Sequence, residues 1–166
     1  MKHEIKSISG AVLFTADVPE GTESGLIACV ALEQAVAGDA NLRGADLGDA
    51  DLGDADLRGA NLGDADLRGA DLGELRSIWG ASGNLRELKA VQCDTWPVTY
   101  TATHMQIGCQ FHTLEAWWSF TDEQITRMDS SALAWWQKWK PVLHTIVTMS
   151  PAVPGSEKPA EQQEAA

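Results

Sequence analysis

The chain has 166 residues and a formal net charge of −12, a length that suits one domain or two very small ones. It contains no apolar run long enough to predict a membrane span, and no apolar segment follows the first four residues to predict a signal peptide. Its three cysteines are too few, and odd in number, for a disulfide framework, so we expect a reducing compartment and a cytoplasmic location. The acidity disfavours direct contact with nucleic acid or membrane, but it can attract a protein that normally binds DNA.

Residues 1–38 predict a β-hairpin followed by a helix. Residues 2–6 and 11–16 read as short strands on either side of a Ser9-Gly10 turn. Residues 23–37 repeat apolar side chains at three- and four-residue spacing, and Gly38 stands where a helix-ending glycine belongs. We expect this helix to lead directly into the next segment.

Residues 40–74 form seven five-residue units, each of which opens Ala-Asp-Leu or Ala-Asn-Leu. A period of five fits neither a helix nor an alternating strand. Low-complexity disorder is the alternative, but disorder does not require the same leucine at every fifth place. The invariant leucine, with an alanine two residues before it, therefore indicates a packed and repeating interior.

This stretch resembles the pentapeptide repeat family, whose motif is A(D/N)LXX. The resemblance implies a mainly β fold, a short right-handed quadrilateral β-helix of about two coils with four units in each coil. It also implies that the leucine and the small residue point inward, that the other positions face solvent, and that the preceding helix covers the first coil. We take 39–74 as the β-helix and 1–38 as its N-terminal hairpin and capping helix.

In that geometry, residues 20 apart stack on one another. Asn41 under Asn61 can form an amide ladder, and three stacks place acids together, Asp54 with Glu74 being one. The other two define an acidic face formed by Asp46, Asp66, Asp51 and Asp71. Because stacked acids repel each other, they serve either solubility or a partner.

The motif stops at Leu75, and we expect a distinct Trp-rich α+β element over 75–149 and a disordered tail over 150–166. Residues 85–91 are either a short helix or irregular, while 98–102 and 104–109 alternate as strands do. Three helices are predicted after that, over 113–118, from a capping box at 121–124, and from Ser130 or Ser131 to about 149. Pro141 is expected to kink the last one.

Chemistry-bearing residues in this element do not form a known motif. Cys93, His104, Cys109 and His112 have the residue types of a zinc site but not the spacing of a standard finger. The same residues contain a possible Cys–His pair, but nothing near them marks an activated thiolate. The sequence therefore predicts no metal, no cofactor and no enzyme.

Two sets of residues are candidates for binding. Adjacent tryptophans on a helix point about 100° apart, so we expect Trp136 and Trp139 in the core and Trp117 and Trp135 at an interface or ligand. The second set combines cations, an aromatic platform and an amide, which suit an anionic, nucleotide-like ligand near the open end of the repeat. Its members are Arg76, Arg86, Lys89, Trp96, Tyr100, His104 and Gln106.

We therefore predict a non-enzymatic, homo-oligomeric binding protein, with three hypotheses for its role. The build resembles small phage and prophage proteins, which implies counter-defence in the host cytoplasm by sequestering a nucleotide-like signalling ligand or by occupying a host defence protein. A known role of the family implies instead an acidic DNA mimic that inhibits a DNA-binding protein such as gyrase. Two coils of about 4.8 Å each fall far short of the 34 Å turn of DNA, however. The third hypothesis is a structural protein–protein interaction module.

Overall fold

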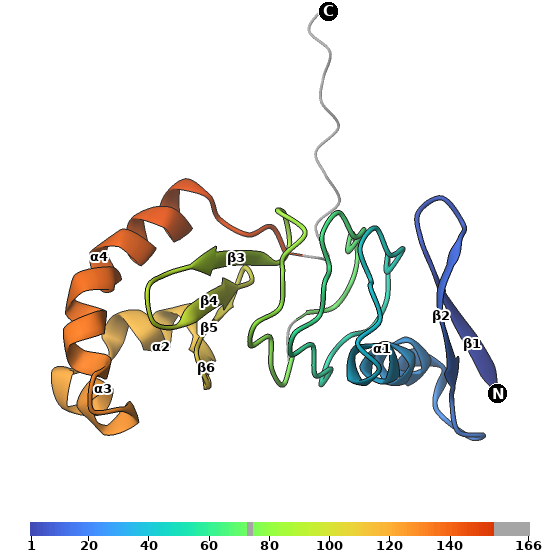
Figure 1. Ribbon diagram of the computed structural model, residues 1–166, viewed down its shortest axis with the longest axis horizontal. Coiled ribbons are helices and arrows are strands. Elements are labelled where there is room, and N and C mark those ends of the chain that lie inside the picture. The colour runs from blue at the N-terminus through green and yellow to red at the C-terminus, as the bar shows by residue number, and fades with distance from the viewer. Residues whose placement is uncertain (73–74, 155–166) are drawn as a thin grey trace, which may run out of the picture.

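The computed structural model describes residues 1–72 and 75–154, and three parts follow one another along its long axis (Figure 1). A hairpin with one helix lies at one end, the repeat lies in the middle, and a four-stranded sheet with three helices lies at the other end (Figure 1).

The N-terminal part confirms the predicted hairpin and helix. Strands β1 (Lys2–Lys6) and β2 (Val12–Asp17) are antiparallel, and the 3-10 turn η1 (Ser24–Leu26) precedes helix α1 (Ile27–Ala37). Gly38 donates its N–H to the carbonyl of Gln34 at 3.0 Å, but its φ is −91°. The left-handed residue is Asp39, with a φ of 52°. The left-handed turn after α1 is therefore made by Asp39 and not, as the sequence predicts, by Gly38.

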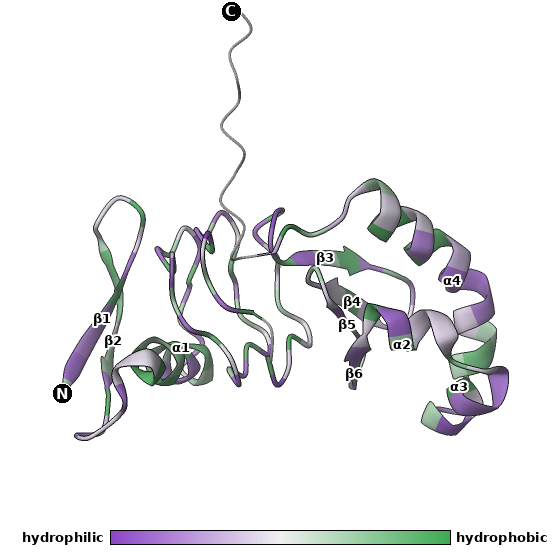
Figure 2. Cartoon of the chain, turned by 180° about the vertical axis from the view of Figure 1, so that it is seen from behind, coloured by the Kyte–Doolittle hydropathy of each residue, from purple (hydrophilic) through white to green (hydrophobic). Residues whose placement is uncertain are grey.

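The repeat coils so that units 20 residues apart lie side by side. Isolated parallel β-bridges join Asn41 to Asn61, Asp46 to Asp66 and Asp51 to Asp71, in the register that the motif predicts. The described leucines of the repeat are buried, and hydrophobic and hydrophilic residues alternate along the coil (Figure 2). These repeats imply a β-helix-like fold, in which single bridges rather than long strands join neighbouring turns.

The coil continues beyond the end of the sequence motif. Parallel bridges join Asp56 to Ser77 and Asn61 to Ser82, and both pairs are 21 residues apart. One extra residue is therefore accommodated between Asp71 and Ser77. Ile78 directly follows Ser77 and is fully buried in this additional turn. Ile78 takes the inward position that leucine has in the repeat, so the coil can continue without the exact Ala-Asp-Leu motif. The division into domains at residue 74 stays a prediction.

Both ends of the coil are covered. Helix α1 buries Ala31, Leu32 and Ala35 in the same core as the repeat leucines, and the end of β1 pairs with the first coil, the carbonyl of Lys6 accepting the N–H of Asp46 at 2.8 Å. At the other end, the side-chain oxygen of Gln106 accepts the N–H of Ile78 at 2.7 Å. This capping satisfies backbone groups that an open coil end would leave exposed.

The C-terminal part is an antiparallel sheet in the order β3 (Lys89–Gln92), β4 (Pro97–Tyr100), β5 (His104–Ile107), β6 (Gln110–Thr113). The two predicted strands are confirmed as β4 and β5, whereas β3 and β6 were not predicted. Of the two alternatives for residues 85–91, the irregular one is confirmed for 85–88, and the segment then enters β3.

Three helices pack on this sheet, α2 (Leu114–Ser119), α3 (Asp122–Met128) and α4 (Ala132–Met149). Thr113 caps α2 and the capping box at Thr121 and Gln124 is present, as predicted. Helix α4 begins after Ser131 and includes Pro141 in its interior.

The segment after α4 is packed where disorder was expected. The hydroxyl of Tyr100 donates to the carbonyl of Ser150 at 2.8 Å, and the N–H of Val153 donates to the carbonyl of Arg86 at 3.1 Å. The predicted tail is therefore wrong for residues 150–154, and 155–166 lie outside the described residues. No helix in the described ranges is long and apolar enough to cross a membrane.

Candidate functional site: a groove between helix α1 and the repeat

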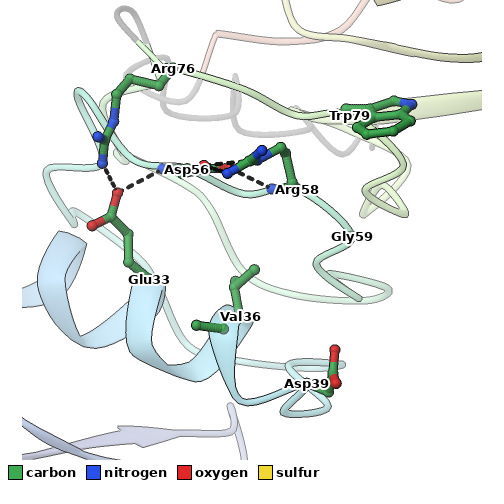
Figure 3. Close-up of a pocket in the computed structure, with 9 residues that line it drawn as sticks. Glu33, Val36, Asp39, Asp56, Arg58, Gly59, Arg76 and Trp79 are labelled. Atoms are coloured by element: carbon green, nitrogen blue, oxygen red, sulfur yellow. Dashed lines mark hydrogen bonds and ion pairs between the residues drawn. The ribbon is translucent and has the colours of Figure 1, made fainter. Parts of the chain in front are cut away.

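An open groove with a volume of about 740 Å³ runs between α1 and the repeat. Figure 3 draws Glu33 and Val36 on α1 and Arg58, Arg76 and Trp79 on the coil. The complete lining consists of Glu33, Val36, Ala37, Asp39, Asp56, Arg58, Gly59, Arg76 and Trp79. We call this the α1 groove.

Arg58 is held by Asp56 of the same repeat unit. Its Nε donates to the two carboxylate oxygens at 2.9 and 2.8 Å, and its backbone N–H donates to Oδ1 at 3.1 Å. Partial burial opposes ionisation of Asp56, but these hydrogen bonds outweigh it, so the pKa of Asp56 lies below its ordinary value. The pair is therefore ionised and matched at neutral pH.

Arg76 joins the coil to α1. Its guanidinium forms an ion pair with Glu33, and its Nε donates to the carbonyl of Asp54 at 2.5 Å. The same carboxylate oxygen of Glu33 accepts the backbone N–H of Asp56 at 3.0 Å. Glu33 thus caps the first coil and fixes the helix against it, which gives the groove a defined wall.

Trp79 provides the apolar part of the groove. Its side chain is 47% exposed, and its backbone carbonyl accepts the N–H of Gly59 at 2.8 Å, which fixes it to the coil. Gly59 has a φ of 71°, a conformation in which glycine avoids the strain of a side chain. An immobilised backbone under an exposed tryptophan offers a rigid contact surface.

This geometry suits recognition of a surface more than chemistry on a substrate. Both guanidinium groups already pair with carboxylates, so the groove is not a strong anion site. Exposed tryptophan and arginine are, however, the residue types enriched at binding hot spots.

A comparison with protein families bears on the coil that forms one wall of the groove. Residues 38–73 match the family described as pentapeptide repeats, in eight copies. These residues are pentapeptide repeats. No curated protein and no solved structure matches the chain. Pentapeptide repeats indicate a protein-interaction module, which agrees with the composition of the groove.

The seven residues predicted to bind a nucleotide-like ligand do not come together. Tyr100 and Gln106 are buried and bonded within the fold, and Lys89 donates to the hydroxyl of Ser150 at 2.7 Å. His104 stacks on Phe111. In the described pockets, Arg76 lines the α1 groove and Trp96 lines a separate cavity among the C-terminal helices.

The remaining member of that set is Arg86, whose Nε lies 3.6 Å from Oε1 of Glu87. The expectation of one converging site is therefore wrong. Lys89 and Tyr100 hold the segment after α4, and Gln106 holds the last coil, so members of this set join parts of the fold.

Trp117 and Trp135 are buried, with 3% and 7% of their surface exposed. Trp117 donates its Nε1–H to the carbonyl of Met105 at 2.7 Å, and Trp135 donates to Asp94 at 2.7 Å. Both therefore lie inside the fold and not at an exposed interface, because the sheet covers Trp117 and the β3–β4 loop contacts Trp135, while contact with a ligand stays a prediction. Trp136 is buried as predicted, and Trp139 is partly buried.

The acidic face of the pentapeptide repeats is present but partly neutralised. Asp46 pairs with Asp66 and Asp51 with Asp71 across the coil, as predicted. Asp66, however, forms an ion pair with Arg68, whose hydrogen bond lowers the pKa of Asp66. Asn61 donates to Asn41 at 3.1 Å, so the predicted amide ladder is confirmed.

The cysteines and histidines do not assemble a metal centre. Among residues 1–72 and 75–154 no three metal-ligating side chains gather. Cys109 is exposed beyond the end of β5, and Cys93 is partly buried in the β3–β4 loop. Partial burial lowers the pKa of His104 and of His112.

Sequence reasoning found Arg76 but missed Glu33, Arg58 and Trp79. The groove depends on the contact of α1 with a coil that the motif did not reveal beyond residue 74. Trp79 was nevertheless recognisable as a tryptophan set apart from the later Trp-rich helices.

Proposed function

We propose that this chain is a non-enzymatic protein-binding module whose contact surface is the α1 groove. The observation that supports this most is that the exposed Trp79 lines the same groove as two arginines that are held in place by carboxylates. The pentapeptide repeats, as a right-handed quadrilateral β-helix, are the rigid scaffold of that surface.

The groove is already organised before a partner binds. Arg58 and Arg76 lose little further side-chain freedom on binding, and a flat indole adds apolar contact area. The two Arg–carboxylate pairs and the carboxylate of Asp39 form a polar rim around the indole, which suits a partner that places an apolar or aromatic group against Trp79.

Affinity capture tests this proposal with the full chain, the Trp79→Ala variant, and a Val142→Ala control from the exposed side of α4. We expect a protein that co-purifies with the unmodified chain and the control and is lost with Trp79→Ala. A captured protein that binds Trp79→Ala as well as the unmodified chain contradicts the groove as its site.

Phage counter-defence by nucleotide sequestration stays a prediction, and its proposed site no longer supports it, since the seven residues lie apart. The same capture experiment distinguishes it, because a nucleotide released from the purified protein by heat, with no partner protein, is the result that sequestration predicts.

DNA mimicry is the second candidate, and the stacked acids of the repeat favour it. The covered ends of the coil argue against it. Helix α1 and the hairpin close one end, and the sheet closes the other (Figure 1), so two copies cannot extend the acidic coil end to end. The partner's retention by an Asp46→Lys, Asp51→Lys variant would exclude mimicry, whereas its loss would favour it.

A further inference from the structure

A small cavity separate from the α1 groove lies where the β5–β6 turn meets helices α2, α3 and α4. Its lining includes four tryptophans, Trp96, Trp117, Trp135 and Trp136, and one carboxylate, Asp129. No lysine, arginine or histidine occurs among the described residues that line it. An aromatic wall with a single negative charge and no positive charge favours a cation.

The tryptophans are fixed in position by the surrounding structure. Trp96 and Trp135 meet edge to face with centroids 5.2 Å apart, and Trp117 and Trp136 meet at 5.3 Å. A Cβ atom at position 108 would lie 3.1 Å from the ring of Trp96, so glycine at this position leaves room for the indole. The cavity wall is therefore built from immobilised rings.

Two of these tryptophans donate their indole N–H to groups outside the cavity wall. Trp117 donates to the carbonyl of Met105, and Trp135 donates to the carboxylate of Asp94. Asp94 also accepts from Trp139 at 3.1 Å and pairs with Lys138 at 2.5 Å. Because these contacts fix the ring planes, the aromatic surfaces are presented without further ordering.

One tryptophan of the cavity wall already contacts an ammonium group of this chain. The Nζ of Lys140 lies 5.4 Å from the centroid of the Trp136 ring, although Lys140 is not among the lining residues. Asp129 lies at the exposed end of α3, where its Oδ1 accepts the N–H and the hydroxyl of Ser131 at 2.8 and 2.7 Å. The carboxylate is therefore held at the mouth of the cavity.

The size of the cavity restricts the ligand. Its volume is about 100 Å³, the space of about three water molecules. A nucleotide is too large, whereas a methylated ammonium head is small, apolar at its surface and positively charged. We propose that this cavity binds a quaternary ammonium group, such as the trimethylammonium end of choline, between the tryptophans and the carboxylate of Asp129.

Titration of the full chain with choline, followed by calorimetry and by the NMR shift of the choline methyl protons, tests the proposal. We expect saturable binding and an upfield methyl shift from the indole rings. The neutral carbon analogue 3,3-dimethylbutan-1-ol has the same shape without the charge, and we expect it to bind at least about tenfold more weakly. Equal binding of the two compounds, or no binding of choline, overturns the proposal.

Variants place the binding in this cavity. Asp129→Asn keeps an acceptor for Ser131 but removes the charge, and we expect it to weaken choline binding by about tenfold. Trp96→Leu should abolish the methyl shift, while Trp79→Leu, an exposed tryptophan of the α1 groove, should leave it unchanged. Choline binding that is insensitive to Asp129→Asn contradicts the proposal even if Trp96→Leu fails to fold.

A final arm distinguishes the source of the group. Sedimentation of the chain with phosphatidylcholine vesicles would assign the group to a lipid headgroup, and choline binding without sedimentation assigns it to a free compound. Loss of Trp79 should disturb the proposed protein partner and not choline, so the two proposals fail independently.

Discussion

Gln106 accepts the backbone N–H of Ile78 at 2.7 Å and the hydroxyl of Ser77 at 3.1 Å, which joins the sheet to the last turn of the coil. Gln106 is buried, and so is Ile78. This amide takes the place that a further coil would occupy and so terminates the pentapeptide repeats inside the protein.

Replacing Gln106 by Leu should therefore destabilise the chain by about 1–3 kcal/mol, the cost of a buried N–H left without an acceptor. Urea denaturation measures this as the change in the free energy of unfolding. Gln92→Leu is the matched control, since Gln92 is exposed on β3, and it should change little. Equal losses in the two variants would mean that Gln106 does not cap the coil.

The continuation of the coil past residue 74 predicts that Ile78 behaves as a repeat leucine does. Ile78→Ala and Leu57→Ala should each lower the free energy of unfolding by about 2–5 kcal/mol, because both side chains are fully buried. Leu85→Ala serves as the control, because Leu85 is 77% exposed. A loss at Ile78 no larger than that at Leu85 would place the end of the coil before residue 75.

Asp94 should make the thermal stability of the chain depend on pH at acidic pH. Hydrogen bonding from Lys138, joined by Trp139 and Trp135, lowers the pKa of Asp94 from 3.8 to about 2. A carboxyl group whose pKa is lower in the folded protein than in the unfolded chain stabilises the fold fully at pH values above its unfolded-state pKa. This stabilisation is lost as the pH falls through its folded-state pKa. The thermal midpoint of the unmodified chain should therefore exceed that of Asp94→Asn at about pH 7, and the difference should shrink between about pH 4 and pH 2.

Thermal unfolding at several pH values provides this comparison, with Glu20→Gln as the control for loss of an exposed carboxylate. A difference between Asp94→Asn and the unmodified chain that is equally large at neutral and at acid pH would contradict the role of Asp94.

Leu85 has a φ of 72° in an exposed bend, a conformation that is strained for a residue with a branched side chain. Leu85→Gly should therefore raise the free energy of unfolding by about 1 kcal/mol. Leu85→Ala retains the strain and is the control, measured in the same urea experiment. No difference between the two variants would mean that the backbone at this position relaxes.

Local sequence rules predicted much of this fold. The coil register followed from the strict leucine period, and the hairpin, the capping box of α3 and the cap of α2 followed from short-range residue patterns. Each depends on residues close together in the chain or on an exact repeat, which are the features that a single sequence reveals.

The site was less predictable because its contacts are distant in sequence. Arg76 meets Glu33 across 43 residues, and Gln106 meets Ile78 across 28. Composition grouped Gln106 with ligand-binding residues, but the contact with the coil end makes it structural. Helical phase indicated that one tryptophan of each pair would be buried, yet α4 packs between the sheet and the β3–β4 loop and buries both Trp135 and Trp136.

The α1 groove as a protein-binding surface is tested most directly by a photoreactive residue in place of Trp79. Benzoylphenylalanine at position 79 should crosslink a partner protein in cells, and the same residue at the exposed Val142 of α4 should not. Crosslinking at position 142 but not at 79, or crosslinking at neither, would contradict the account.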